Sequence, residues 1–181
     1  MALVAPLHPD DRGRYLSGVR RMSEESIYKR FMTPVTRLSE SQLRYLLDVD
    51  HRDHDALLAV DEESGEAVGV ARFVRLDQAE VAEAAVIVTD DWQGFGLGKA
   101  LCRILAERAR ELGIERFQAT LLVSNTAMMS LLESMGPVRV VSSEGPTIVV
   151  DVTLPERGIG EHMAGVLRAA ARGEVEVASA D

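Results

Sequence analysis

A turn with three alternate glycines, between a strand-like segment and an amphipathic helix, constrains this chain more than any other feature. Residues 86–101 read VIVTDDWQGFGLGKAL, with glycines at positions 94, 96 and 98. Glycine lets the backbone adopt positive φ and approach a ligand closely, and the free N–H groups at the start of the following helix face any bound anion. The turn is therefore predicted to bind phosphate groups.

Spacing excludes two better-known phosphate loops. A dinucleotide-binding fingerprint that started at Gly94 would need a third glycine at Lys99. A Walker A loop that ended in Gly98-Lys99 would need glycine at Gln93 and Ser or Thr at Ala100. What remains is the pattern Q-x-x-G-x-G, with a strand before it and a long helix after it.

Composition limits the class of protein. The 181 residues are 46% hydrophobic, which suits one domain with one core. No apolar run approaches the roughly 18 residues that cross a bilayer, and the apolar start is too short for a secretory signal. The single cysteine, Cys102, allows no disulfide framework and favours a reducing cytoplasm. The net charge of −9 argues against a nucleic-acid partner; it suits a cationic acceptor, or serves solubility alone.

Hydrophobic periodicity predicts a mixed α/β chain without internal repeats. Ser23, the capping box at Ser39 and Asn125 are predicted to begin helices, and Gly113 to end the helix that follows the glycine turn. Strands are predicted over residues 3–7, 56–60, 67–74, 81–89, 117–123, 138–141 and 147–154, and further helices from Pro9 and over residues 162–172, before a frayed acidic end.

The glycine turn, taken with this order of elements, resembles the acyl-coenzyme A pyrophosphate loop of the GNAT acetyltransferase superfamily. Residues 23–32, 49–57 and 79–86 look like the acetyltransferase domain of bacterial Pat-type protein lysine acetyltransferases. The resemblance implies an α/β (α+β) GNAT fold, whose central mixed, mostly antiparallel sheet is flanked by helices. It would occupy residues 1–155, followed by a C-terminal helix and tail over residues 156–181.

The same resemblance implies a function. The chain would transfer acetyl from acetyl-CoA, its co-substrate, to lysine side chains of proteins such as acyl-CoA synthetases. The expected location is the cytoplasm, with neither nucleic acid nor membrane as a partner. Two alternatives stay open: acetylation of a small amine such as a polyamine or an aminoglycoside, and a catalytically weak module that senses acyl-CoA.

Glu83 is the candidate catalytic residue. By resemblance, the general base for direct attack by the amine lies ten residues before Gln93 of the loop, which is Glu83. Strand alternation places its carboxylate on a largely apolar face with Ala85 and Ile87. A solvated strand residue is the alternative, and Glu80 is the nearest competitor for the role of base.

The resemblance also implies the cofactor contacts. Asn125 could equally serve as a helix N-cap alone, and Lys99 as a solvated lysine. The position at which many superfamily members carry a tyrosine acid is occupied by Leu132, so the thiolate would leave unprotonated or take a proton from water. The implied cofactor-binding residues are Val86, Ile87, Val88, Gln93, Gly94, Phe95, Gly96, Leu97, Gly98, Lys99 and Asn125.

A metal site is not expected. His51, Asp53, His54 and Asp55 are the densest group of potential ligands, but side chains this close in sequence before a strand point in different directions. No distant pair of His or Cys residues completes a ligand set.

Overall fold

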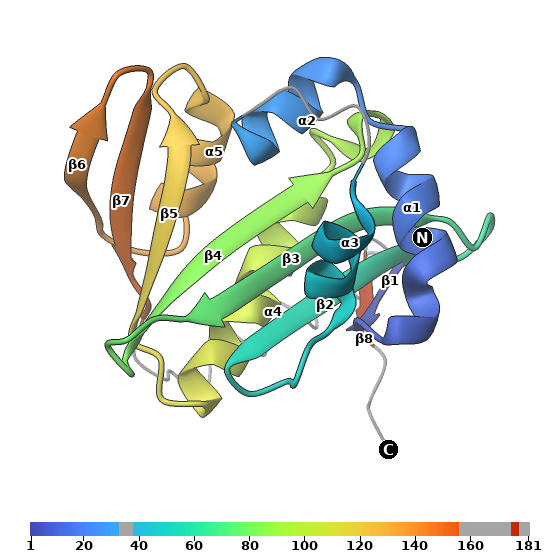
Figure 1. The fold of residues 1–181 in the computed structure, drawn as a ribbon, viewed down its shortest axis with the longest axis horizontal. Helices are drawn as coiled ribbons and strands as arrows, with labels where there is room; N and C mark the ends of the chain where they lie inside the picture. Colours follow the sequence, from blue (N-terminus) through green and yellow to red (C-terminus); the bar gives the residue numbers. More distant parts are fainter. Residues whose placement is uncertain (33–37, 156–174, 178–181) are drawn as a thin grey trace.

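The computed structural model describes residues 1–32, 38–155 and 175–177. Its strands are β1 (Ala2–Pro6), β2 (His54–Asp61), β3 (Ala67–Arg75), β4 (Val81–Val88), β5 (Arg116–Leu122), β6 (Val138–Glu144), β7 (Thr147–Thr153) and β8 (Val175–Val177). They form one sheet in the order β6-β7-β5-β4-β3-β2-β1-β8 (Figure 1). Neighbours are antiparallel except β4 with β5 and β1 with β8, which confirms the predicted mixed, mostly antiparallel sheet.

Helices flank this sheet. Two predicted starts are confirmed: the Ser23 hydroxyl accepts a hydrogen bond from the Ser26 N–H at 3.2 Å, and Ser39 and Gln42 form a reciprocal capping box. In the described part of the chain the helices are α1 (Arg12–Arg20), α2 (Glu24–Phe31), α3 (Glu40–Leu47), α4 (Leu97–Glu111) and α5 (Thr126–Glu133), with short 3-10 turns η1 (Pro9–Asp11) and η2 (Asp90–Trp92).

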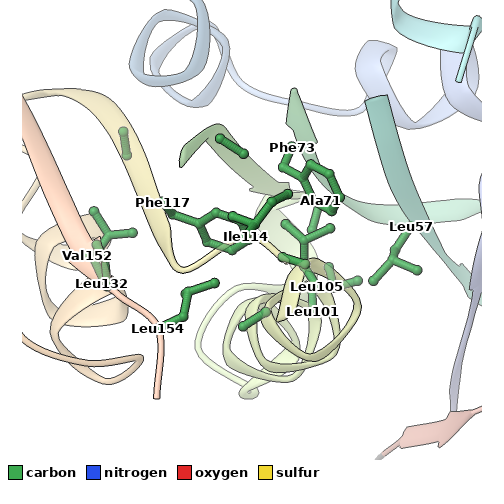
Figure 2. Packing of buried hydrophobic residues seen from close by; sticks show 14 of the residues in the cluster. Leu57, Ala71, Phe73, Leu101, Leu105, Ile114, Phe117, Leu132, Val152 and Leu154 are labelled. Atoms are coloured by element: carbon green, nitrogen blue, oxygen red, sulfur yellow. The ribbon is translucent and has the colours of Figure 1, made fainter. Parts of the chain in front are cut away.

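Each face of the sheet carries a hydrophobic core. Leucines of α3 and Tyr15 of α1 pack on one face of β2 and β3. On the other face α4 and α5 cover a larger cluster, part of which Figure 2 shows around Phe73, Leu101 and Phe117. A Cβ added at Gly69 of β3 would lie 3.0 Å from Leu101 Cδ1, so glycine allows α4 to lie this close to the sheet.

The pairing between β4 and β5 covers only three residues of each strand. Residues 81–83 pair with residues 116–118, whereas β4 stays paired with β3 as far as Val88 and β5 with β7 as far as Leu122. The two strands therefore diverge beyond Glu83 and Gln118, as the ribbon shows (Figure 1). Residues 84–88 have β3 on one side and a gap on the other.

The C-terminal region is only partly described. The helix predicted over residues 162–172 lies outside the described residues, and the boundary between a domain at 1–155 and a tail at 156–181 stays a prediction. Val175–Val177, in the predicted frayed end, pair with β1 as β8. Among the helices of the described residues, none has the length and apolar character needed to cross a membrane.

Candidate active site

A cleft of about 500 Å³ opens where β4 and β5 diverge. Residues 84–88 of β4 and residues of α5 line it, together with residues of α2, the glycine turn, Trp92, and Thr120 and Leu121 of β5. Nine of the predicted cofactor contacts line this cleft: Val86, Ile87, Val88, Gln93, Gly94, Gly96, Gly98, Lys99 and Asn125.

Two residues of the predicted set are not part of the cleft lining. Phe95 is 78% exposed at the tip of the turn. Leu97, the first residue of α4, is buried in the core. Any contact from these two residues to a ligand in the cleft would therefore come from their backbone groups.

The glycine turn has the geometry of an anion site. Gly94 and Gly96 have φ of 82° and 86°, a left-handed conformation that favours glycine. The first N–H that donates within α4 belongs to Ala100, which bonds the Gly96 carbonyl at 3.0 Å. Backbone N–H groups of residues 94–99 donate to no other described residue, so the positive end of α4 has free donors beside the cleft.

Hydrogen bonds fasten α2 to the glycine turn. The Asp90 carboxylate accepts from the Ser23 N–H at 2.7 Å, the Ser23 hydroxyl at 2.9 Å and the Ser26 hydroxyl at 2.7 Å. Partial burial raises the pKa of Asp90, but the hydrogen bonds from Ser23 and Ser26 outweigh this and hold it below its ordinary value. Gln93 Nε2 donates to the Val88 carbonyl at 3.0 Å and to Ser26 Oγ at 3.2 Å, so the loop glutamine links β4 to α2.

Glu83 lies at the point where β4 and β5 separate. It is the last residue of β4 that pairs with β5, directly opposite Gln118, and its side chain is exposed. Its face of β4 also carries Ala85 and Ile87, as strand alternation predicted.

Two arginines on this face correct the prediction of largely apolar surroundings for Glu83. Arg72 of β3 is 5% exposed and donates to the Leu46 carbonyl at 2.8 Å. Arg30 of α2 lines the cleft; burial lowers its pKa, whereas the neighbouring Tyr15 and Glu83 raise it. A guanidinium keeps its charge in a protein, so the Glu83 carboxylate faces a cation.

Asn125 and Leu132 lie at the N-terminus and on the buried face of α5, as the sequence predicts. Asn125 Oδ1 accepts from the Met128 N–H at 3.2 Å, which makes it the N-cap of α5, and the same residue lines the cleft. Leu132 is 2% exposed in the core, and its aliphatic side chain has no proton to offer a leaving group.

The group of His and Asp residues at the start of β2 is engaged in hydrogen bonds and ion pairs. Asp55, fully buried, bonds His51 Nδ1 at 2.8 Å and Arg108 Nε at 2.6 Å. His54 Nε2 lies 3.2 Å from the Arg72 guanidinium. Within the described ranges, no three His, Cys, Asp or Glu side chains gather closely enough to hold a metal ion.

Sequence reasoning missed the part of the site that comes from outside β4 and its loop. Ser26, Lys29 and Arg30 of α2 all line the cleft. Their i, i+3, i+4 spacing places them on one helix face, but nothing in the sequence indicates which element that face would meet. For Gln118 the sequence pattern predicts a strand position and no role in the site.

Comparison with known proteins now identifies the fold. A family model described as "Acetyltransferase (GNAT) family" matches residues 23–136, which include the glycine turn, Glu83 and Asn125. The chain belongs to the GNAT acetyltransferase family. Acetyltransferase Pat of Mycolicibacterium smegmatis is 35% identical over 153 residues, 84% of this chain, and the chain spans 45% of the length of that relative.

Solved GNAT structures resemble this one. The GNAT domain of S. lividans PAT superposes with a TM-score of 0.77 at 32% identity, covering 83% of this chain and 89% of that one. An acetyltransferase from Salmonella typhimurium, solved with its cofactor acetyl-CoA, gives a TM-score of 0.64 at 20% identity, covering 87% of this chain and 96% of that one. The chain thus shares the GNAT fold and is similar in sequence to acetyltransferases of the Pat type.

Proposed function

We propose that this chain transfers the acetyl group of acetyl-CoA to lysine side chains of proteins, with Glu83 as the general base. One observation carries the proposal: the stretch of β4 that lines the cleft, residues 84–88, is preceded by Glu83 and followed by the turn with the free backbone donors. An anion-binding site and a proton acceptor at the two ends of such a stretch are what this reaction requires.

The residues present fit acetyl-CoA. The free N–H groups of residues 94–99 and Lys99 would hold the pyrophosphate, since α4 presents its positive end there. The unpaired edge of residues 84–88 would bond the amides of the pantetheine arm as an added strand would. When bound, acetyl-CoA supplies a thioester as the acyl donor.

Glu83 would overcome the main obstacle for a lysine acceptor. With a pKa near 10.4, only about a thousandth of lysine is neutral near pH 7.5, a deficit of roughly 4 kcal/mol. A positioned general base contributes on the order of 10² to 10⁴ in rate. Glu83 would take one proton from the lysine ammonium, through a water, and the neutral amine would then attack the thioester carbonyl. The C–S bond breaks as the amide forms, the thiolate departs, and the second proton of the nitrogen passes to water. Because Leu132 offers no proton, that thiolate would leave unprotonated or take a proton from water.

The open surface beside Glu83 supports a protein acceptor rather than a small amine. Thr120 of β5 and Arg139 of β6 are exposed, and among the described residues α1 and α3 pack over β2 and β3 rather than over this half of the sheet (Figure 1). A polypeptide could reach the end of the cleft across this surface. The 35% identity to a Pat acetyltransferase points the same way, and we extend the proposal to a cytoplasmic location.

Incubation with labelled acetyl-CoA and a lysate of the source cell tests this function. We expect acetyl-lysine on discrete proteins, identified by tandem mass spectrometry, with none formed by a variant that cannot bind coenzyme A. Robust turnover of spermidine or kanamycin, with no labelled protein, would show that the acceptor is a small amine and not a protein lysine. Tight binding of acetyl-CoA without turnover of any acceptor would show that the chain is a module that senses acyl-CoA.

A further inference from the structure

Four polar residues form a row across the sheet beside the cleft. Glu83 of β4 pairs with Gln118 of β5, Gln118 pairs with Asp151 of β7, and Asp151 pairs with Arg139 of β6. Directly paired residues project from the same face of a sheet. The row therefore runs from the sheet edge at β6 to the proposed base at the mouth of the gap.

Asp151 fixes the orientation of the Gln118 side chain. Its carboxylate is buried and accepts from Gln118 Nε2 at 3.1 Å, while its other oxygen accepts from Arg139 Nη2 at 3.1 Å and Arg116 Nη1 at 3.5 Å. An ionised carboxylate only accepts hydrogen bonds, so the amide nitrogen of Gln118 must face it. The amide oxygen is then turned away from Asp151, and it bonds no described residue.

An attacking amine needs such an oxygen. A lysine ammonium carries three N–H groups, of which one proton goes to the base and two stay on nitrogen. Buried or half-buried donors require partners, and two fixed acceptors define the direction of the nitrogen lone pair better than one. Glu83 and Gln118, directly paired at the point of divergence, present two acceptors side by side.

We infer that Gln118 binds the acceptor amine through Oε1, and that Asp151 is a positioning residue that holds the Gln118 amide in this orientation. The inference rests on the proposed function, because it assigns the amine-binding contact of that same site. It predicts a preference for primary amines, whose two remaining N–H groups would bond Gln118 Oε1 directly and Glu83 through the intervening water.

Gln118→Met tests the contact because it keeps the length of the side chain and removes the amide. The acceptor KM of a lysine peptide should rise about tenfold or more, while the KM of acetyl-CoA stays within twofold. Asp151→Asn should likewise raise the acceptor KM and leave the KM of acetyl-CoA unchanged. Without the Asp151 carboxylate, the Gln118 amide can turn its nitrogen toward the amine. Gln78→Met is the matched control: Gln78 accepts from Arg116 at 3.4 Å but lies in the turn before β4.

The outcomes separate the inference from the proposed function. Calorimetry of the lysine peptide with the coenzyme A-bound protein should show the same tenfold loss in both variants, independently of turnover. An unchanged acceptor KM in Gln118→Met, with the wild type active, would overturn the inference and leave the function intact. If Gln118→Met does not bind coenzyme A, the Asp151→Asn variant provides the test: its acceptor KM should rise while its KM for acetyl-CoA stays unchanged, and an unchanged acceptor KM would overturn the inference. A wild type that acetylates no lysine would overturn both.

Discussion

The two parts of β4 look alike in sequence but meet different neighbours. Residues 82 and 83 are paired with β3 on one side and β5 on the other, whereas residues 84–88 are paired with β3 alone. Apart from Glu83, both parts consist of small or branched apolar residues. The difference arises because β5 turns away to follow β7, which leaves the edge of β4 beside a cleft lined by α2 and α5.

This comparison shows that the site occupies the part of the sheet where pairing stops. Backbone N–H and C=O groups require hydrogen-bond partners; the Gln93 side chain bonds the Val88 carbonyl, and the groups of residues 84–87 that face the gap must find theirs in solvent or a ligand. Glu83 marks the boundary between the paired and the open part. The predictions below test the open part against matched positions elsewhere.

The largest effect is expected at the loop that closes the open part. Gly96→Val should abolish coenzyme A binding in calorimetry, because a β-branched residue is strained at a φ of 86° and the free N–H groups would be displaced. Gly65→Val is the matched control: Gly65 has a φ of 70°, and, as at Gly96, a Cβ there would meet nothing within 4 Å. Unchanged coenzyme A affinity in a folded Gly96→Val protein would refute the phosphate site.

Next in size is the effect at the boundary residue. Glu83→Gln should lower kcat by about 10² or more at neutral pH, since the amide keeps the shape but cannot accept the proton. The deficit should shrink at high pH, where the amine increasingly arrives neutral. Acetyl-CoA affinity should stay within a few-fold, and Glu80→Gln, whose carboxylate lies 3.7 Å from Arg116, should retain kcat. Near wild-type kcat at pH 7 for Glu83→Gln would remove its assignment as base.

A several-fold effect is expected where α2 is fastened over the open part. Asp90→Ala removes three hydrogen bonds to Ser23 and Ser26, so coenzyme A affinity should fall several-fold and the free energy of unfolding by on the order of 1 kcal/mol. Because the pKa of Asp90 is lowered in the fold, its contribution to stability is present above pH about 4 and is lost as pH falls through the folded value.

Asp91→Ala is the control for this tether. Asp91 lies in the same 3-10 turn and pairs with Arg21 instead of α2. Its loss should leave coenzyme A affinity unchanged in calorimetry. Equal losses of affinity in the two variants would show that the turn itself, and not its bonds to α2, shapes the cleft.

The smallest effect on rate is expected at α5. Leu132→Tyr should leave kcat within twofold, because the reaction does not depend on an acid there, while the larger ring costs about 1 to 3 kcal/mol of stability in a site that is 2% exposed. Thermal unfolding and steady-state kinetics measure the two quantities. A several-fold gain in kcat would instead show that protonation of the thiolate limits the reaction.

The sequence predicted those features that depend on local chemistry. Ser23, Ser39 and Asn125 begin helices because their side chains cap nearby N–H groups, and the glycine turn precedes α4 as its pattern indicated. Strand alternation also placed Glu83 on the same face as Ala85 and Ile87.

Features that depend on contacts between distant segments could not be predicted. The divergence of β4 and β5 depends on the pairing of β5 with β7, and the row from Glu83 to Arg139 on the register of four strands. Likewise, Arg30 and Arg72 reach the face of Glu83 from α2 and β3, so a pattern read along β4 alone described that face as apolar. Local periodicity carries no information on such neighbours.

Hydrogen exchange at the amides of β4, followed residue by residue by NMR with and without coenzyme A, tests the central claim most directly. Saturating coenzyme A should slow exchange at those amides of residues 84–88 that face the gap, and at residues 94–99, by at least about tenfold. Exchange at residues 82 and 83, already paired on both sides, should not change. Protection that appears elsewhere in the protein, with none at residues 84–88, would contradict the assignment of the open part of β4 as the cofactor site.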